Sequence, residues 1–214
     1  MKEEKTGVGA LNLLTEGNLR FAHNQSQNPS DLEQRRLDLR SGQAPFAVVV
    51  GCSDSRVCPE IIFDVNLGDL FVIRTAGHVI DESVLGSMQY AVKHLHVPLI
   101  VVLGHSCCGA VQAAVDRVKE VKSLNKLIKS IHHTIKDCLC RKGIDIDHVI
   151  EEHTKLDTEH LKDRWSFFAP YIKSGDLTII AAHYDMATGL VKFFNPEAEG
   201  CESADVDEKS TALR

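Results

Sequence analysis

The sequence predicts an α/β protein built on a central, mostly parallel β-sheet that is flanked by helices. Val- and Ile-rich apolar runs occur at 46–51, 70–74, 98–103 and 177–182, and the segments between them have helical periodicity. Near-continuous apolar runs are typical of parallel strands buried on both faces, and strands that alternate with helices favour a parallel sheet. We therefore expect four parallel strands plus a short edge strand at 190–194.

Two long helices are predicted between the third and fourth apolar runs. Residues 118–140 carry apolar side chains at steps of three and four, and Gly143 then interrupts the pattern. A second helix is expected from about 147 to 168, with its apolar residues on one side. We expect this pair to cover a face of the sheet or a subunit interface.

The N-terminal region is predicted to form a helical arm over residues 1–40. The stretch from Ala10 to Phe21 is amphipathic and precedes a polar segment rich in Asn and Gln. This pattern suggests a helix that packs away from its own sheet, and an arm of this kind can reach across a dimer.

Length and composition favour one domain over residues 1–194. Residues 195–214 hold six acidic and two basic residues and little apolar content, so we expect a disordered acidic tail. The formal charge of −6 provides no basic stripe for nucleic acid. No run of eighteen apolar residues and no signal-peptide core occurs, so we expect no membrane partner and a cytoplasmic protein.

Two motifs with metal-ligand chemistry directly follow the first and third apolar runs. Cys52 and Asp54 lie in GCSDSR, and His105 and Cys108 lie in GHSCCG. A single cysteine is more often a small buried hydrophobe than a ligand, but here two thiols, an imidazole and a carboxylate occur in pairs at two strand ends. The carboxyl ends of parallel strands meet at one edge, so the sequence predicts a tetrahedral zinc site there.

Asp54 has two candidate partners, the metal and Arg56. If Asp54 is the fourth ligand, the site is closed, as in a structural zinc site. If Arg56 binds the carboxylate through paired hydrogen bonds, one coordination position is open to water. The plainer alternative is a surface ion pair that contributes about 0–1 kcal/mol. Because two thiolates cancel the charge of zinc, an open site predicts activity that rises above neutral pH.

These residues also carry a family resemblance. The motifs CSDSR and HSCCG, with GDLFVIRTAG and YAVKHL between them, resemble the β-class carbonic anhydrases from about residue 10 to about 194. The resemblance implies one Zn²⁺ per chain, bound by Cys52, His105 and Cys108, with a dyad of Asp54 and Arg56 gating the fourth metal position. It also implies reversible hydration of carbon dioxide to bicarbonate and a proton, by attack of zinc-bound hydroxide, in a homodimer or homotetramer.

The same resemblance implies a small apolar substrate pocket, often shared between subunits. Gln43 matches a glutamine that hydrogen-bonds bicarbonate, and the backbone amide of Gly109 assists. The other expected pocket residues are Phe71, Ala76 and Tyr90. One departure is His78, which follows Ala76 and Gly77 where the family often has Asn.

Two other functions use the same residues. The first is hydrolysis of carbonyl sulfide or carbon disulfide on the same fold, although Gln43 favours an oxygen anion. The second is a non-catalytic structural zinc module in which Asp54 is a permanent ligand. Arg56 would then have no evident purpose.

Overall fold

The computed structural model describes residues 6–28, 30–118, 121–136, 145–164 and 166–194, which fold around one five-stranded sheet. The strand order is β2-β1-β3-β4-β5. The first four strands are mutually parallel, and β5 pairs antiparallel to β4 at the edge. The predicted architecture of four parallel strands plus a short edge strand is confirmed. The strands are β1 Ala47–Cys52, β2 Leu70–Thr75, β3 Leu99–His105, β4 Thr178–Tyr184 and β5 Val191–Phe194.

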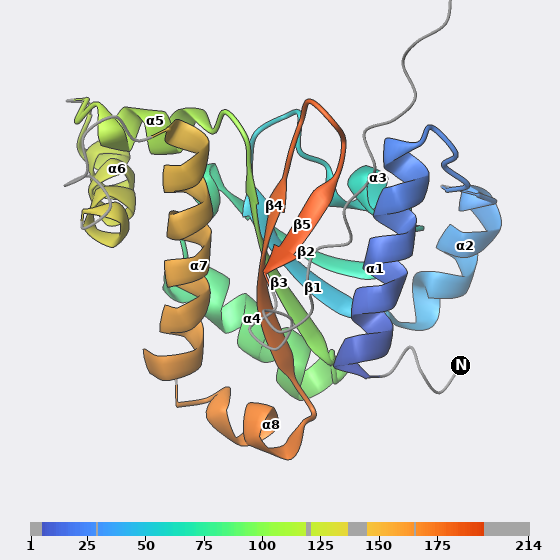
Figure 1. Cartoon of the computed structure of the whole chain (residues 1–214). Helices are drawn as coiled ribbons and strands as arrows, with labels where there is room; N and C mark the ends of the chain where they lie inside the picture. Colours follow the sequence, from blue (N-terminus) through green and yellow to red (C-terminus); the bar gives the residue numbers. More distant parts are fainter. Residues whose placement is uncertain (1–5, 29, 119–120, 137–144, 165, 195–214) are drawn as a thin grey trace, which may run out of the picture.

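The two central strands, β1 and β3, are buried at every residue, as their uninterrupted apolar sequences predict. Alternate side chains of these strands point to opposite faces of the sheet. Val49 faces a core that includes Ala10 and Leu14 of the first helix. Val50 faces a second core that includes Met88 of the fourth helix. Helices therefore cover both faces of the sheet (Figure 1).

The helices differ in length and in the part of the sheet they cover. The first and fourth helices begin at N-caps: Thr6 accepts a hydrogen bond from the Gly9 amide, and Asp81 accepts bonds from the Ser83 and Val84 amides. The helices and short 3₁₀ turns are α1 Gly7–Ala22, α2 Leu32–Asp38, η2 Leu39–Ser41, α3 Pro59–Ile62, η3 Ala76–His78, α4 Glu82–Leu95, α5 Gly109–Val115, α6 Lys122–Ile135, α7 Ile146–Arg164 and α8 Ala169–Ser174.

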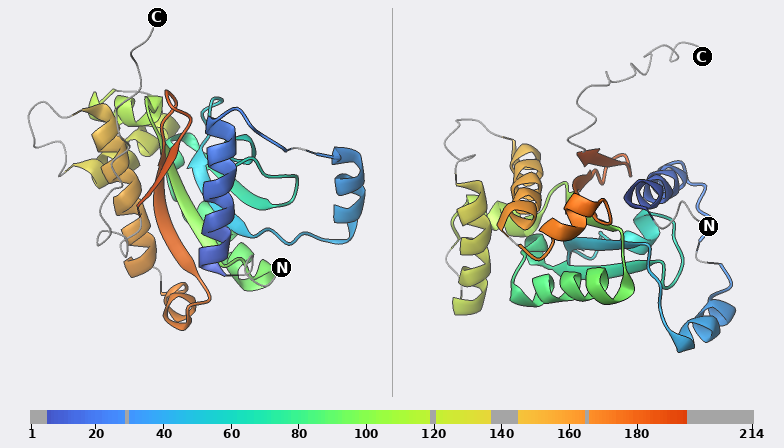
Figure 2. Two further views of the ribbon diagram at one scale, coloured as in Figure 1. Left: turned by 45° about the vertical axis from the view of Figure 1, so that its right-hand side comes forward. Right: turned by 90° about the horizontal axis from the view of Figure 1, so that it is seen from below.

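The N-terminal region is helical as predicted, but α1 does not pack away from its own sheet. Ala10 and Leu14 are fully buried against the sheet of the same chain, and Asn18 bonds to the carbonyl oxygens of Ile62 and Gly189. The part that stands apart is α2, which has no buried residue and projects from the body (Figure 2). The apolar stripe of α1 was correctly recognised, but the surface it covers is intramolecular.

The helix predicted over 118–140 begins later than expected. Its described part, α6, begins at Lys122, and Val118 and Val121 are exposed residues that precede it. The helix predicted from 147 to 168 corresponds to α7, which ends at Arg164. α7 covers β3 and β4, so the expectation that this pair covers a face of the sheet is confirmed for α7, whereas α6 packs on α5 and α7 (Figure 1).

Some expectations lie outside the described residues. They are the interruption at Gly143, the end of the predicted helix beyond residue 136, and the acidic tail over 195–214. Among the helices that the structure describes, none is both long enough and apolar enough to cross a membrane.

Candidate metal centre

Three predicted ligands meet at the carboxyl edge of the sheet. Cys52 ends β1, His105 ends β3, and Cys108 lies directly before α5. β1 and β3 are parallel neighbours, with Gly51 opposite Leu103, so both strand ends reach the same edge. The ligand atoms of the three side chains lie within 4.8 Å of one another, and all three residues are at least 95% buried. Two sulfurs and one imidazole nitrogen form a donor set that zinc prefers.

His105 is oriented for metal binding. Its Nδ1 lies 2.9 Å from the carbonyl oxygen of Ser106, which can only accept a hydrogen bond, so Nδ1 carries the proton. Its Nε2 is buried and has no hydrogen-bond partner in the part of the chain that the structure describes. A ligating histidine commonly donates its other ring nitrogen to a carbonyl group in this way. The unpartnered lone pair on Nε2 therefore fits a metal ion.

The Cys52 sulfur is held in the anionic form that binds metal. The backbone amides of Asp54 and Gly77 donate hydrogen bonds to Sγ at 3.4 and 3.3 Å. The hydrogen bond from the Cys108 thiol makes the largest contribution to a strongly lowered pKa of Cys52; burial opposes the shift, and His105 and the two amides support it. The contact with Cys52, together with burial, raises the pKa of Cys108. The two thiols thus share one proton, which a metal ion must displace.

Asp54 is not among the clustered ligand atoms, because Arg56 binds it. Arg56 Nε donates to Oδ1 at 2.9 Å and Nη2 donates to Oδ2 at 2.7 Å, while the Arg56 amide also donates to Oδ1 at 3.0 Å. These bonds, with the side-chain bonds contributing most, hold the pKa of Asp54 well below its usual range. The carboxylate is therefore ionised and already has three donors. Three of the four predicted ligands are therefore clustered, and the fourth, Asp54, is paired with Arg56.

Two residues that position the ligand loops were not predicted. Arg74, in β2, donates from Nε to the carbonyl oxygen of Cys52 at 2.8 Å and from Nη2 to that of Asp54 at 2.6 Å. Asp147, in α7, accepts the Cys107 amide at 2.9 Å, at a residue with φ of +57°. Arg74 lies in the motif GDLFVIRTAG, and an arginine inside an apolar strand was the available signal. Nothing in the sequence pairs Asp147 with Cys107.

The expected pocket residues fall into two groups. Ala76 follows Thr75, which is opposite Cys52, and Gly109 follows Cys108, so both lie beside the ligands. Phe71 is opposite Val48, about 13 Å along the strand from Thr75 at ~3.3 Å per residue. The ring of Tyr90 contacts that of Phe71, with centroids 6.3 Å apart.

Gln43 lies before the amino end of β1 and is exposed, at the opposite end of that strand from Cys52. Within one chain, therefore, Gln43, Phe71 and Tyr90 are not brought to the metal centre.

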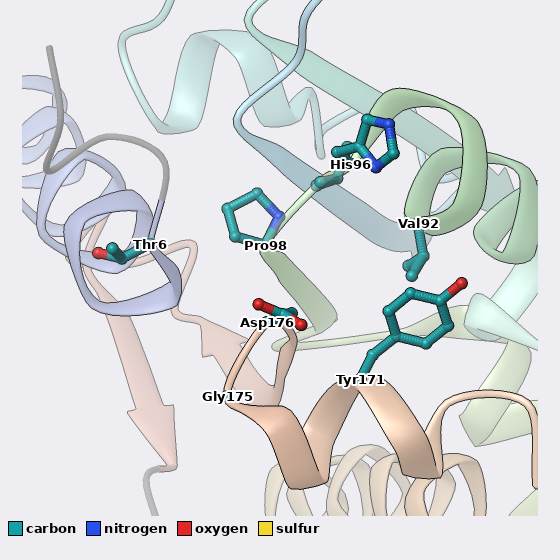
Figure 3. A pocket seen from close by; sticks show the side chains of 8 residues that line it. Thr6, Val92, His96, Pro98, Tyr171, Gly175 and Asp176 are labelled. Carbon is teal, nitrogen blue, oxygen red and sulfur yellow. The ribbon is translucent and has the colours of Figure 1, made fainter.

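The structure also has a cavity of about 500 Å³ at the opposite edge of the sheet (Figure 3). Pro98 and Asp176, which line it, precede the first residues of β3 and β4. Val92 and Tyr171 supply apolar walls. Cys52, His105 and Cys108 do not line the cavity, so it is separate from the candidate metal centre.

The fold and the ligand set together define a class of protein: an α/β protein with a three-ligand thiolate and imidazole centre at the carboxyl edge of a parallel sheet. Sequence comparison then identifies the family. The model of the carbonic anhydrase family matches residues 47–191, which include all three ligands and the dyad. The chain belongs to this family, in its β class, and is a carbonate dehydratase, an enzyme of carbon dioxide hydration.

Individual relatives agree with this assignment. Carbonic anhydrase 2 of Mycobacterium tuberculosis is 42% identical over 186 residues, covering 85% of this chain and 90% of that protein. A carbonic anhydrase of Mycolicibacterium smegmatis is 41% identical over 189 residues, covering 86% and 92%. Among solved structures, the β-carbonic anhydrase CcaA superposes with a TM-score of 0.68 at 27% identity, covering 87% of this chain and 88% of that one.

Proposed function

We propose that this chain catalyses the reversible hydration of carbon dioxide to bicarbonate at one zinc ion held by Cys52, His105 and Cys108. The observation that carries the proposal is the burial of these three ligand atoms within 4.8 Å of one another, while Asp54 is bound elsewhere. When bound, zinc would act as a Lewis acid that lowers the pKa of a water molecule at its open position, which makes a nucleophile available near neutral pH.

We propose that Asp54 and Arg56 gate the fourth position. Three hydrogen bonds from Arg56 occupy the Asp54 carboxylate, so it does not compete for the metal while the dyad is intact. The Arg56 guanidinium also donates to the Cys107 carbonyl oxygen at 3.4 Å, which ties the dyad to the loop that carries Cys108. Loss of the arginine would release the carboxylate to close the site.

The substrate pocket is proposed to form between two copies of the chain. Ala76 and Gly109 lie beside the ligands, whereas Gln43, Phe71 and Tyr90 lie at the other end of the strands. Gln43 is exposed and Tyr90 is 48% exposed, so both are accessible to a partner copy. A homodimer, alone or paired into a homotetramer, would bring these residues to a neighbour's metal centre, where the apolar rings suit carbon dioxide and Gln43 suits bicarbonate. We place this activity in the cytoplasm.

The other two functions have less support. A structural zinc module needs Asp54 as a fourth ligand, but Arg56 binds both of its oxygens. Hydrolysis of carbonyl sulfide or carbon disulfide would use the same centre, and no contact among the described residues favours sulfur. The experiment below therefore includes a result that would indicate each of these functions.

Stopped-flow measurement of carbon dioxide hydration, with metal analysis of the same sample, tests the proposal. We expect one zinc ion bound by Cys52, His105 and Cys108, hydration activity above neutral pH, loss of activity with a chelator, and recovery when zinc is restored. Bound zinc without hydration at any alkaline pH would overturn the proposal. Turnover of carbonyl sulfide or carbon disulfide by that inactive sample would indicate the sulfur hydrolase, and no turnover of either would indicate the structural module.

A further inference from the structure

A second buried polar cluster lies beside the metal centre but shares no residue with it. His78 comes from η3, and His153 and Asp157 come from α7. The three residues are 0%, 1% and 9% exposed. The two imidazole rings stack with centroids 4.5 Å apart, and one ligand atom from each of the three side chains lies within 4.8 Å of the others. Burial of three ionisable side chains in one place requires an explanation.

The histidine nitrogens in this cluster lack partners. Three nitrogens have no hydrogen-bond partner among the residues that the structure describes: both ring nitrogens of His78, and Nδ1 of His153. Buried polar atoms in native proteins are nearly always paired, so these unpaired nitrogens indicate a missing partner. The other nitrogen of His153, Nε2, lies 3.7 Å from Asp157 Oδ2 and 3.3 Å from the Gly77 carbonyl oxygen. When the histidines are neutral and the aspartate is ionised, each of the three side chains carries an electron pair that a metal ion can accept. A cation suits that arrangement.

The surrounding contacts resemble those that hold metal ligands in place. His153 Nε2 lies 3.3 Å from the Gly77 carbonyl oxygen, and Asp157 Oδ1 lies 3.5 Å from the Thr134 hydroxyl oxygen. Ligating histidines and carboxylates are commonly oriented by hydrogen bonds of this kind. His153 and Asp157 are four residues apart on α7, a spacing that places two ligands on one helix face.

The protonation of the cluster is also compatible with metal binding. Burial, supported by nearby histidines, holds the pKa of His78 well below its usual value, so its ring is neutral. Burial raises the pKa of Asp157. A bound cation would lower that pKa again, because it favours the ionised carboxylate. Two imidazoles and one carboxylate suit first-row divalent metals better than they suit Ca²⁺ or Mg²⁺.

We propose that His78, His153 and Asp157 form a second divalent-cation site, distinct from the Cys52, His105 and Cys108 centre, which binds a first-row ion such as Zn²⁺. Gly77 connects the two sites, since its amide donates to Cys52 Sγ and its carbonyl oxygen faces His153 Nε2. An ion bound in the second site would therefore hold the turn that supplies a hydrogen bond to the catalytic thiolate.

Cobalt titration of the metal-free full-length protein separates the two sites. Thiolate-to-cobalt charge-transfer absorption arises only where sulfur is a ligand, so it reports the first centre alone. We expect two cobalt ions bound per chain, with the charge-transfer band accounting for one of them. One bound ion per chain would overturn the proposal. The charge-transfer band tests the Cys52, His105 and Cys108 centre, whereas the number of bound ions tests the second site. Failure of the proposed function would therefore appear as a missing band, and failure of this inference as a single bound ion.

Substitution then assigns the second ion to its ligands. Asp157→Asn should bind one ion per chain and keep the full charge-transfer band, and His153→Gln should do the same if Asp157→Asn does not fold. Glu159→Gln, an exposed carboxylate on the same helix, is the matched control and should still bind two. Retention of two ions by a folded Asp157→Asn or His153→Gln variant would overturn the assignment.

Discussion

Arg56 binds both carboxylate oxygens of Asp54, with Nε 2.9 Å from Oδ1 and Nη2 2.7 Å from Oδ2. Asp54 lies two residues after Cys52, a proposed metal ligand, where it would otherwise be available to the same metal ion. In the structure Asp54 is paired with Arg56, and the three side chains that could hold a metal ion are those of Cys52, His105 and Cys108. This pairing is the observation on which the proposed open, catalytic centre rests.

The pH dependence of catalysis should follow the charge of the ligands. Two thiolates neutralise Zn²⁺, so water at the open position is acidified less than in a site of three imidazoles, where its pKa is ~7. The pKa of Asp54 lies far below this range, so the dyad stays ionised throughout. We expect kcat/KM for hydration to rise from about pH 7 toward about pH 9. A stopped-flow pH profile that is flat, or greatest below neutrality, would contradict the proposal that two thiolates bind the zinc ion.

Gly77→Ala should destabilise the protein and weaken metal binding. Gly77 has φ of +62°, and an added Cβ would lie 2.7 Å from Ile131 Cδ1 and 3.1 Å from Ala110 Cβ. A left-handed alanine costs about 1–3 kcal/mol, and the required shift would move the amide that bonds to Cys52. Urea unfolding measures the first effect. Competition with a zinc chelator measures the second, expected at about 10–100-fold.

Gly86→Ala is the matched control for that substitution. Gly86 lies inside α4, and an added Cβ there has no heavy atom within 4 Å. Alanine should stabilise the helix by about 0.5–1 kcal/mol without changing zinc affinity. If both variants weaken zinc binding equally, the effect does not arise from the turn at Gly77.

Asp64→Asn should cost about 2–3 kcal/mol of unfolding free energy at neutral pH. Burial alone raises the pKa of Asp64, but hydrogen bonds from Arg20, Asn28 and Gln27 outweigh it and lower the pKa. A lowered pKa stabilises the fold above the unfolded value of ~3.9, and this contribution is lost as the pH falls through the folded value. The difference between wild type and variant should therefore be constant above about pH 5 and shrink below about pH 4.

Denaturant unfolding over that pH range measures the difference. Glu16→Gln, an exposed carboxylate on α1, is the control and should change stability by less than about 0.5 kcal/mol at every pH. A pH-independent difference for Asp64→Asn would show that the ionised form of Asp64 is not what stabilises the fold.

The strands were predictable from sequence because β1 and β3 are buried on both faces, so their apolar runs are uninterrupted. The helix boundaries were less predictable. Val118 and Val121 fit a helical period, yet they are 39% and 73% exposed and precede α6. Periodicity shows that apolar residues could share a face, but it cannot show whether anything packs against that face.

The cluster of Cys52, His105 and Cys108 was predictable because its residues follow two strands whose positions were clear. The residues that orient them were not. Arg74 donates hydrogen bonds to the backbone oxygens of Cys52 and Asp54. Every residue has a backbone oxygen, so the sequence does not indicate which one an arginine will bind. His78 and His153 are distant in the chain, and their rings meet only because the fold brings η3 and α7 together. The roles of Gln43 and Tyr90 cannot be checked within one chain, because the proposed pocket needs a second chain.

The most direct test of the gated centre is the hydration rate of Arg56→Ala at measured zinc content, compared with the surface variant Arg36→Ala. The account predicts one zinc in the Cys52, His105 and Cys108 centre of both variants. It also predicts a kcat/KM at least about 100-fold below wild type for Arg56→Ala alone, because the released Asp54 closes the fourth position. Zinc-loaded Arg56→Ala with a kcat/KM close to that of wild type would contradict it.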